Sequence, residues 1–172
     1  MTIWTAPAVD RQHKAKAGDE RTMLESMLEF HRATLLTKCA GLTAEQLKQH
    51  ATDPSSMSLL GLIRHLTEVE RGWFRTSAAG EKLDPFYCSE ANPDGDFDDV
   101  GDADAEADYA TYLAELDRVR TAAAALPLDR TFVHNETTFN VRWVYLHLLE
   151  EYARHNGHAD LLRERIDGTT GE

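Results

Sequence analysis

The sequence predicts an all-α protein, an up-down four-helix bundle formed by a single domain over residues 1–172. Four long segments carry apolar residues at steps of three and four, the spacing of one helical face. No repeat and no linker separates two cores, and a chain of 172 residues fits one domain better than two. The most regular apolar stripe lies near the C-terminus, at Val141, Val144, Leu148, Tyr152, His155, Ala159, Leu162 and Ile166.

The chain begins with a polar lead-in, residues 1–18, which a first helix should follow at about residues 19–42. Thr43 and Gln46 then match a capping box, in which the first and fourth side chains satisfy each other's backbone amides, so a short helical turn is expected. Residues 53–56 break the chain after it. The first helix should turn one apolar face to the core, formed by Met23, Met27, Phe30 and Leu35.

A second helix is expected to begin at Ser58, whose hydroxyl can cap it, and to end near Gly80. A third helix, at about residues 103–125, is rich in Ala, Leu and Glu and closes at Pro127, which cannot continue it. The second helix has a broad apolar face, formed by Leu59, Leu62, Ile63, Leu66, Val69, Trp73 and Phe74.

Residues 131–140 interrupt the helical pattern, and their β-branched and aromatic side chains favour an extended or irregular segment. Asn140 can cap the last helix, which should run to about Asp167. Gly168 then stands where a left-handed residue commonly ends helices. Four long helices connected in this way form an up-down bundle, with room for a longer crossover between the second and the third.

That crossover is a long acidic loop at residues 84–108, which carries ten Asp or Glu and no Lys or Arg. Such a run is usually a solvated loop. A calcium loop is the alternative, because Asp94, Asp96 and Asp98 copy the first three ligand positions of an EF-hand. The sixth position requires Gly for the turn and is Asp99, and the Glu required at the twelfth is missing as well. We therefore reject calcium.

Composition excludes several classes of function. A formal charge of −12 repels phosphate backbones, so nucleic acid is not an expected partner. The start of the chain has no apolar signal segment, and no stretch approaches the roughly 18 apolar residues of a membrane span. Cys39 and Cys88 have no spacing that suggests disulfides or a zinc ribbon. These features predict a cytoplasmic protein with no membrane partner.

His155 stands in the apolar stripe of the last helix, where Leu would be expected. Glu151 precedes it by one turn, so both side chains leave the helix in nearly the same direction, with Cβ atoms about 6 Å apart. His65 borders the apolar face of the second helix and can also point inward. Two imidazoles and one carboxylate on two helices can hold a divalent metal ion, with a position left open for water or a substrate sulfur.

Each of these residues also has a simpler interpretation. A lone His on an apolar face is more often a hydrogen-bonded core residue, and Glu-x-x-x-His is a common charge pair on exposed helices. His158 is the main competitor for the third ligand, and His147 lies one turn before Glu151; we place both beside the ligands or in the pocket wall. The remaining histidines are expected on the surface or in loops: His13, His31, His50 and His134.

Two segments, LLGLIRHLTEVERGWFR at residues 59–75 and RWVYLHLLEEYARHNGHADLLRERIDG at residues 142–168, resemble the DinB-like family of metal-binding four-helix bundles. The resemblance extends over most of the chain and concerns the actinobacterial branch long described as a domain of unknown function. In the family, one His comes from the second helix and a His-x-x-x-His pair from the last. The resemblance thus implies His65, Glu151 and His155 as metal ligands. The Glu departs from the pattern, as in relatives similar to mycothiol-dependent maleylpyruvate isomerase.

The resemblance also implies a chemistry, because this branch is similar to mycothiol S-transferases. A low-molecular-weight thiol, such as mycothiol, bacillithiol or glutathione, would be transferred to an electrophilic small molecule. Zinc is the expected ion, with nickel, iron and manganese as alternatives, and it would lower the pKa of the bound thiol from about 8.5. The chain shows no Ser-His-Asp or activated-Cys pattern that would supply a nucleophile of its own.

Other functions stay open at this point. A thiol-dependent isomerase would use the same site. An Fe(II)-dependent oxygenase-like enzyme is an alternative, because two histidines and a carboxylate also form the iron ligand set of such enzymes. A non-catalytic metal-binding bundle with a role in stress or detoxification would instead have a closed site, with His158 as a further ligand. The apolar faces of a bundle would also allow a homodimer.

Overall fold

The computed structural model describes residues 3–171 and is mostly helical, as the sequence predicts. A two-stranded antiparallel hairpin is present as well, so the chain is not purely α-helical. In chain order, the elements are α1 (Glu20–Cys39), α2 (Ala44–Lys48), α3 (Leu59–Glu70), the π-helical η1 (Arg71–Ala78), α4 (Gly95–Asp98), α5 (Ala105–Ala124), β1 (Thr131–His134), β2 (Thr137–Asn140) and α6 (Val141–Asp167).

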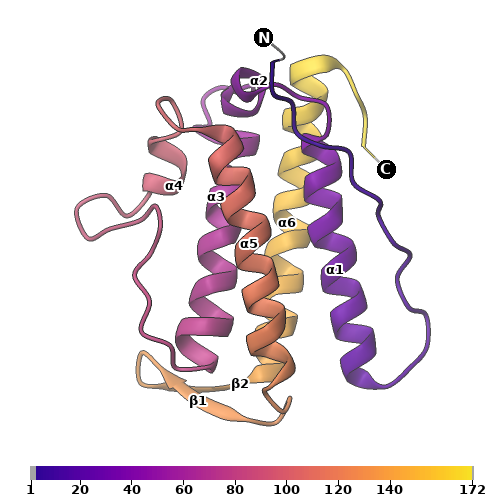
Figure 1. Cartoon of the computed structure of the whole chain (residues 1–172), viewed down its shortest axis with the longest axis vertical. Coiled ribbons are helices and arrows are strands. Elements are labelled where there is room, and N and C mark those ends of the chain that lie inside the picture. Colours follow the sequence, from indigo (N-terminus) through magenta and orange to yellow (C-terminus); the bar gives the residue numbers. More distant parts are fainter. Residues whose placement is uncertain (1–2, 172) are drawn as a thin grey trace.

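The four long helices lie side by side (Figure 1). Helix α1 packs mainly on α6, and α3 packs on both α5 and α6. The colours of Figure 1 show that α1 and α6 run toward one end of the molecule, whereas α3 and α5 run toward the other. The alternating direction expected of an up-down bundle is therefore not observed. The reason is the segment between α3 and α5, which returns along the length of the molecule before α5 begins.

Local signals set most of the helix ends. Ser58 accepts a hydrogen bond from the amide of Gly61 at the start of α3, and Asn140 accepts one from the amide of Trp143 at the start of α6. The capping box predicted before α2 is present, and Gly168 ends α6 with a left-handed φ of 79°. These caps satisfy backbone amides that a helix end leaves without partners, which explains why the predicted boundaries hold to within a few residues.

The predicted stripe of α6 is buried from Val141 to Leu162. The prediction for α1 was wrong for three of its four residues: Leu35 is fully buried, but Met23, Met27 and Phe30 are only half-buried. Met27 and Phe30 lie beside the N-terminal lead-in, where the Lys14 ammonium sits 4.4 Å from the centre of the Phe30 ring. The buried face of α1 includes a charged residue near its centre.

That residue is Arg32, which forms a buried ion pair. Its Nε and Nη2 atoms donate to the two Glu70 carboxylate oxygens, each at 2.6 Å, and both residues are almost completely enclosed. The Tyr152 hydroxyl donates to the same carboxylate at 2.9 Å and lies 2.8 Å from the Tyr112 hydroxyl. One polar network therefore connects α1, α3, α5 and α6 inside the core.

Immediately after Glu70 the helix continues as η1, in a π-helical geometry that the periodicity did not predict. Glu115 of α5, which is fully buried, is 2.7 Å from Arg75 and 3.3 Å from Arg71, so two guanidinium groups fix η1 to α5.

The hairpin β1–β2 fills the segment predicted to be extended and pairs Phe132 with Phe139. Among residues 3–171, no helix has the length and apolar character that crossing a membrane requires.

Candidate metal centre

The three residues predicted as metal ligands come together between α3 and α6. One ligand atom from each of His65, Glu151 and His155 can be chosen so that all lie within 4.8 Å of one another. Glu151 Oε2 is 3.3 Å from His155 Nε2 and 3.8 Å from His65 Nε2. The carboxylate thus lies between two imidazoles that belong to different helices.

This geometry fits a small divalent ion. Donor atoms of a tetrahedral zinc site, at about 2.1 Å from the ion, lie about 3.4 Å from one another. The separations at Glu151 are close to that value, so small side-chain rotations would suffice to bring all three donors onto one ion. Two imidazoles and one carboxylate also leave a fourth position to an outside molecule. A divalent metal is therefore a suitable occupant.

The sequence did not predict that Asp96, on α4, lies at this candidate site. Its Oδ2 is 2.8 Å from His65 Nδ1, so the carboxylate holds the proton on Nδ1 and turns Nε2 toward Glu151. Metal-binding histidines are commonly oriented in this way by a carboxylate. The acidic run was interpreted as a solvated loop, yet Asp96 is only 4% exposed. Part of that interpretation was therefore wrong.

A glycine makes the approach of Asp96 possible. Gly61 lies one turn before His65, and a Cβ atom at Gly61 would be only 2.7 Å from a ring carbon of Phe97. The missing side chain lets the Phe97 ring rest directly on α3. The neighbouring Asp96 then meets His65, so the position of the acidic segment depends on this close contact.

His155 is the most buried of the three residues. Burial first, and then the neighbouring His65 imidazole, lower the pKa of His155 to about 4, although the Glu151 carboxylate acts in the opposite direction. At neutral pH the imidazole is therefore uncharged, with a nitrogen lone pair free to bind a metal ion.

This lowered pKa predicts a pH-dependent stability of the metal-free protein. The unfolded chain takes up a proton on His155 below its ordinary pKa of 6.5, whereas the folded protein resists this down to about 4. The free energy of unfolding should therefore fall as the pH drops through this window, by about 2 kcal/mol between pH 7 and pH 5 from this residue. Urea unfolding of chelator-treated protein at both pH values measures the change.

The control compares two histidine variants. Between pH 7 and pH 5, the free energy of unfolding of His155→Gln should fall by about 2 kcal/mol less than that of the parent protein. His50→Gln, which changes an exposed histidine, should keep the full dependence of the parent protein. Equal pH dependence in all three proteins would show that His155 is not the source.

Two further histidines lie close to the cluster. His158 Nδ1 is 3.3 Å from His155 Nδ1, on the side of the ring opposite to Glu151. His147 Nε2 is 3.9 Å from Glu151 Oε1 and its ring stacks on Trp143. Neither is part of the cluster of three. His134 was expected to be an ordinary surface residue, but it is half-buried on β1, where it pairs with the Ser77 hydroxyl at 3.1 Å.

Neither cysteine is suited to act as a nucleophile. Cys39 is completely buried, and burial raises the pKa of its thiol to about 12. Burial also raises the pKa of Cys88, as do the nearby Asp96 and Glu68 carboxylates. Because the thiolate is the reactive form, these raised pKa values make both side chains poorer nucleophiles at neutral pH.

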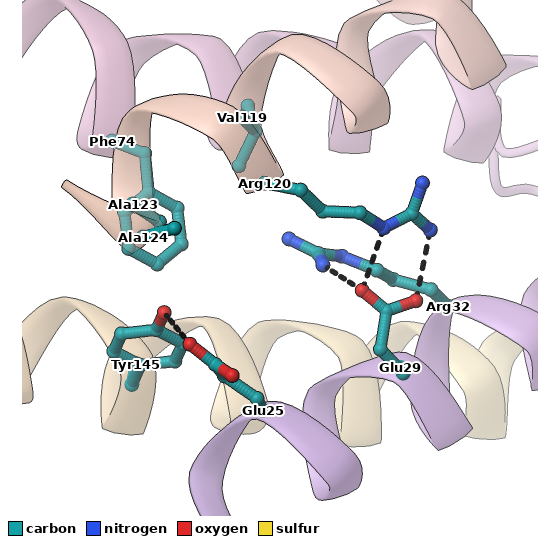
Figure 2. Close-up of a pocket in the computed structure, with 9 residues that line it drawn as sticks. All are labelled: Glu25, Glu29, Arg32, Phe74, Val119, Arg120, Ala123, Ala124 and Tyr145. Carbon is teal, nitrogen blue, oxygen red and sulfur yellow. Dashed lines mark hydrogen bonds and ion pairs between the residues drawn. The ribbon is translucent and has the colours of Figure 1, made fainter. Parts of the chain in front are cut away.

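A cavity of about 280 Å³ lies apart from this cluster, between α1, α5, η1 and the start of α6. Figure 2 shows its charged groups paired with one another: Glu29 accepts from both Arg32 and Arg120, and Glu25 accepts from the Tyr145 hydroxyl. The rest of its wall is apolar, formed by residues such as Phe74 and Val119. None of the three potential metal ligands lines this cavity.

Comparison with known families supports the resemblance seen in the sequence. No curated protein matches the chain. Residues 23–168, most of the chain, match the family model described as mycothiol-S-transferase. The matched range contains all three residues of the cluster as well as Asp96, and this family is DinB-like, which confirms the resemblance seen in the sequence. The chain therefore belongs to the mycothiol S-transferase family.

Proposed function

We propose that the protein transfers a low-molecular-weight thiol of the mycothiol type to an electrophilic small molecule, at a divalent metal ion held by His65, Glu151 and His155. The observation that supports this most strongly is the convergence of the three donor atoms within 4.8 Å in a member of the mycothiol S-transferase family. Zinc fits the donor set, and nickel, iron and manganese are alternatives. When bound, the ion would favour the thiolate form of a thiol.

The residues around the site have distinct roles in this proposal. Asp96 keeps the His65 proton on Nδ1, so that Nε2 remains a donor. Glu151 lies between the two imidazoles and contributes one negative charge. Burial keeps His155 uncharged at neutral pH. Together they present two imidazole nitrogens and one carboxylate, an arrangement that leaves a net positive charge on a divalent ion.

In this proposal the attacking sulfur comes from outside the protein, because burial disfavours the thiolate form of both cysteines. In a substitution reaction, the outside sulfur forms a bond to the electrophilic carbon while the bond to the leaving group breaks. The leaving group departs with the bonding electron pair, and the proton of the thiol passes to solvent. The protein supplies position and charge and forms no covalent bond itself.

The test measures conjugation of a chlorodinitroarene with the metal-loaded protein. Conjugation above the uncatalysed rate should require both the metal and an added thiol, with mycothiol tested beside glutathione. Without added thiol, intact-mass analysis should find no adduct on the protein. His65→Ala should abolish the catalysed rate through loss of a donor, whereas His50→Ala, at an exposed position, should preserve it. Catalysis by metal-free protein, or an adduct on Cys88, would contradict the proposal.

A further inference from the structure

A groove of about 440 Å³ begins at His65 and follows α3 and η1 toward the hairpin. From His65 to Trp73 the helix advances two turns, or about 12 Å. A molecule lying in the groove could thus reach from the cluster of potential metal ligands to the Trp73 ring. This geometry suits an elongated small molecule with its reactive end at His65.

Both ends of the groove present aromatic surface. The Phe97 ring is 5.3 Å from the His65 ring, centre to centre. At the other end, the Trp73 ring is 5.1 Å from His134 and 4.9 Å from Trp143. These neighbours restrict the tryptophan, so its surface is already ordered before a ligand arrives. Ordered aromatic surface favours flat, apolar ligands.

The charges of the groove are all of one sign. Among the described residues that line it, none is Lys or Arg, and three are acidic: Glu68, Asp94 and Asp96. Asp96 is paired with His65, and Glu68 accepts the backbone amide of Tyr87 at 2.6 Å. The Asp94 carboxylate is exposed and has no hydrogen bond or ion pair with any described residue. Among the described residues that line the groove, an anionic ligand would find no Lys or Arg to pair with and one unpaired like charge, Asp94.

Carboxylates beside the cluster would lower the positive charge that a bound divalent ion presents to the groove without cancelling it. Glu151 lies adjacent to His155 and His65, and Asp96 is paired with His65. A thiolate bound directly to the ion would still be stabilised. A carboxylate at the Trp73 end of the groove, about 12 Å away, would gain little from the ion.

We propose that this groove binds the electrophile and selects uncharged aromatic molecules over those that carry a carboxylate. The assignment of the bound molecule as electrophile rests on the proposed function, whereas the selectivity for charge rests on the groove itself. Aromatic surface at both ends provides the attraction, and the unpaired Asp94 provides the discrimination. Specificity of this kind arises from a repulsive element as well as an attractive one.

The first experiment measures binding without catalysis. Metal-free protein is titrated by calorimetry with naphthamide and with naphthoate, which have nearly the same shape and differ in charge. The amide should bind at least about tenfold more tightly. Asp94→Asn should narrow this preference about threefold, because an exposed carboxylate acts weakly, and Asp102→Asn, which is exposed and outside the groove, should not change it. Equal affinities, tighter binding of naphthoate, or no binding of naphthamide would overturn the inference.

A second pair of variants locates the ligand. A Cβ at Gly72, which lines the groove, would meet no atom within 4 Å, so Gly72→Leu can extend into the open space. It should weaken naphthamide binding at least about tenfold. Gly101→Leu has equally open surroundings and lies outside the groove, so it should bind normally. Circular dichroism and metal content confirm that each variant is folded. Normal binding to a folded Gly72→Leu would place the ligand elsewhere and overturn the inference.

An activity measurement separates the two proposals. Metal-loaded protein with added thiol should convert chlorodinitrobenzamide at least about tenfold faster than chlorodinitrobenzoate, after each rate is divided by its uncatalysed rate. Preference for the benzoate would overturn the selectivity and leave thiol transfer intact. If neither compound is converted while naphthamide still binds in preference to naphthoate, the proposed thiol transfer fails and the selectivity of the groove stands.

Discussion

Replacing His155 with alanine should remove nearly all of the bound divalent metal, whereas replacing His158 should leave most of it. His155 Nε2 points at Glu151, and loss of one of three donors leaves too few protein ligands for a stable site. His158 lies against the opposite nitrogen of the same ring, Nδ1. Elemental analysis after dialysis against trace zinc provides the measurement.

Asp96 provides a graded variant in the same experiment. Asp96→Asn removes the charge that orients His65 but keeps the three donors, so the metal affinity should fall about 10- to 100-fold without being lost.

Chelation should lower the melting temperature of the parent protein, because metal at a thousandfold excess over Kd stabilises the folded state by about 4 kcal/mol. It should have little effect on His155→Ala.

The opposite pattern would contradict this assignment of ligands. If His158→Ala empties the site while Glu151→Ala retains the metal, the donors on α6 have been assigned one turn too early.

Replacing Glu70 with alanine should lower the free energy of unfolding by about 3–5 kcal/mol, because it leaves a buried guanidinium without its main partner. Arg32 is 4% exposed and donates two hydrogen bonds of 2.6 Å to Glu70. Burial opposes its charged form, yet the Glu70 carboxylate outweighs this effect and raises the pKa of Arg32. Urea unfolding measures the loss.

A surface ion pair of equal length is the control. Arg120 is 2.6 Å from Asp117, whose side chain is 78% exposed, so Asp117→Ala should cost less than about 1 kcal/mol. The double variant Arg32→Met with Glu70→Leu should recover much of the loss, since it removes both charges together. A cost for Glu70→Ala no greater than that for Asp117→Ala would mean that the network contributes no more than a surface pair.

Much of the secondary structure could be predicted because it depends on residues close together in the chain. The caps at Ser58, Asn140 and Gly168 involve residues at most four positions apart. The burial of the α6 stripe follows from its regular spacing. The relation of Glu151 to His155 is equally local, one turn of a single helix. Metal binding itself remains a prediction from these positions.

The acidic segment illustrates what local patterns could not predict. Its composition indicated a solvated loop, and Asp96 was considered only as part of a calcium loop. Its role beside His65 depends on the path of the chain after η1 and on the absence of a side chain at Gly61, which are long-range properties. The burial of Arg32 likewise depends on Glu70, thirty-eight residues further along the chain.

The helical segments, several of their caps and the three residues with suitable chemistry for a metal follow from the amino-acid sequence alone. The common direction of α3 and α5, the contact of Asp96 with His65 and the acidic, aromatic groove toward Trp73 arise from the tertiary fold. The two groups of features differ in the distance along the chain over which their interactions act. Periodicity and capping act within one or two helical turns, whereas the partner of a side chain on another helix depends on how the intervening chain returns and how closely two backbones approach.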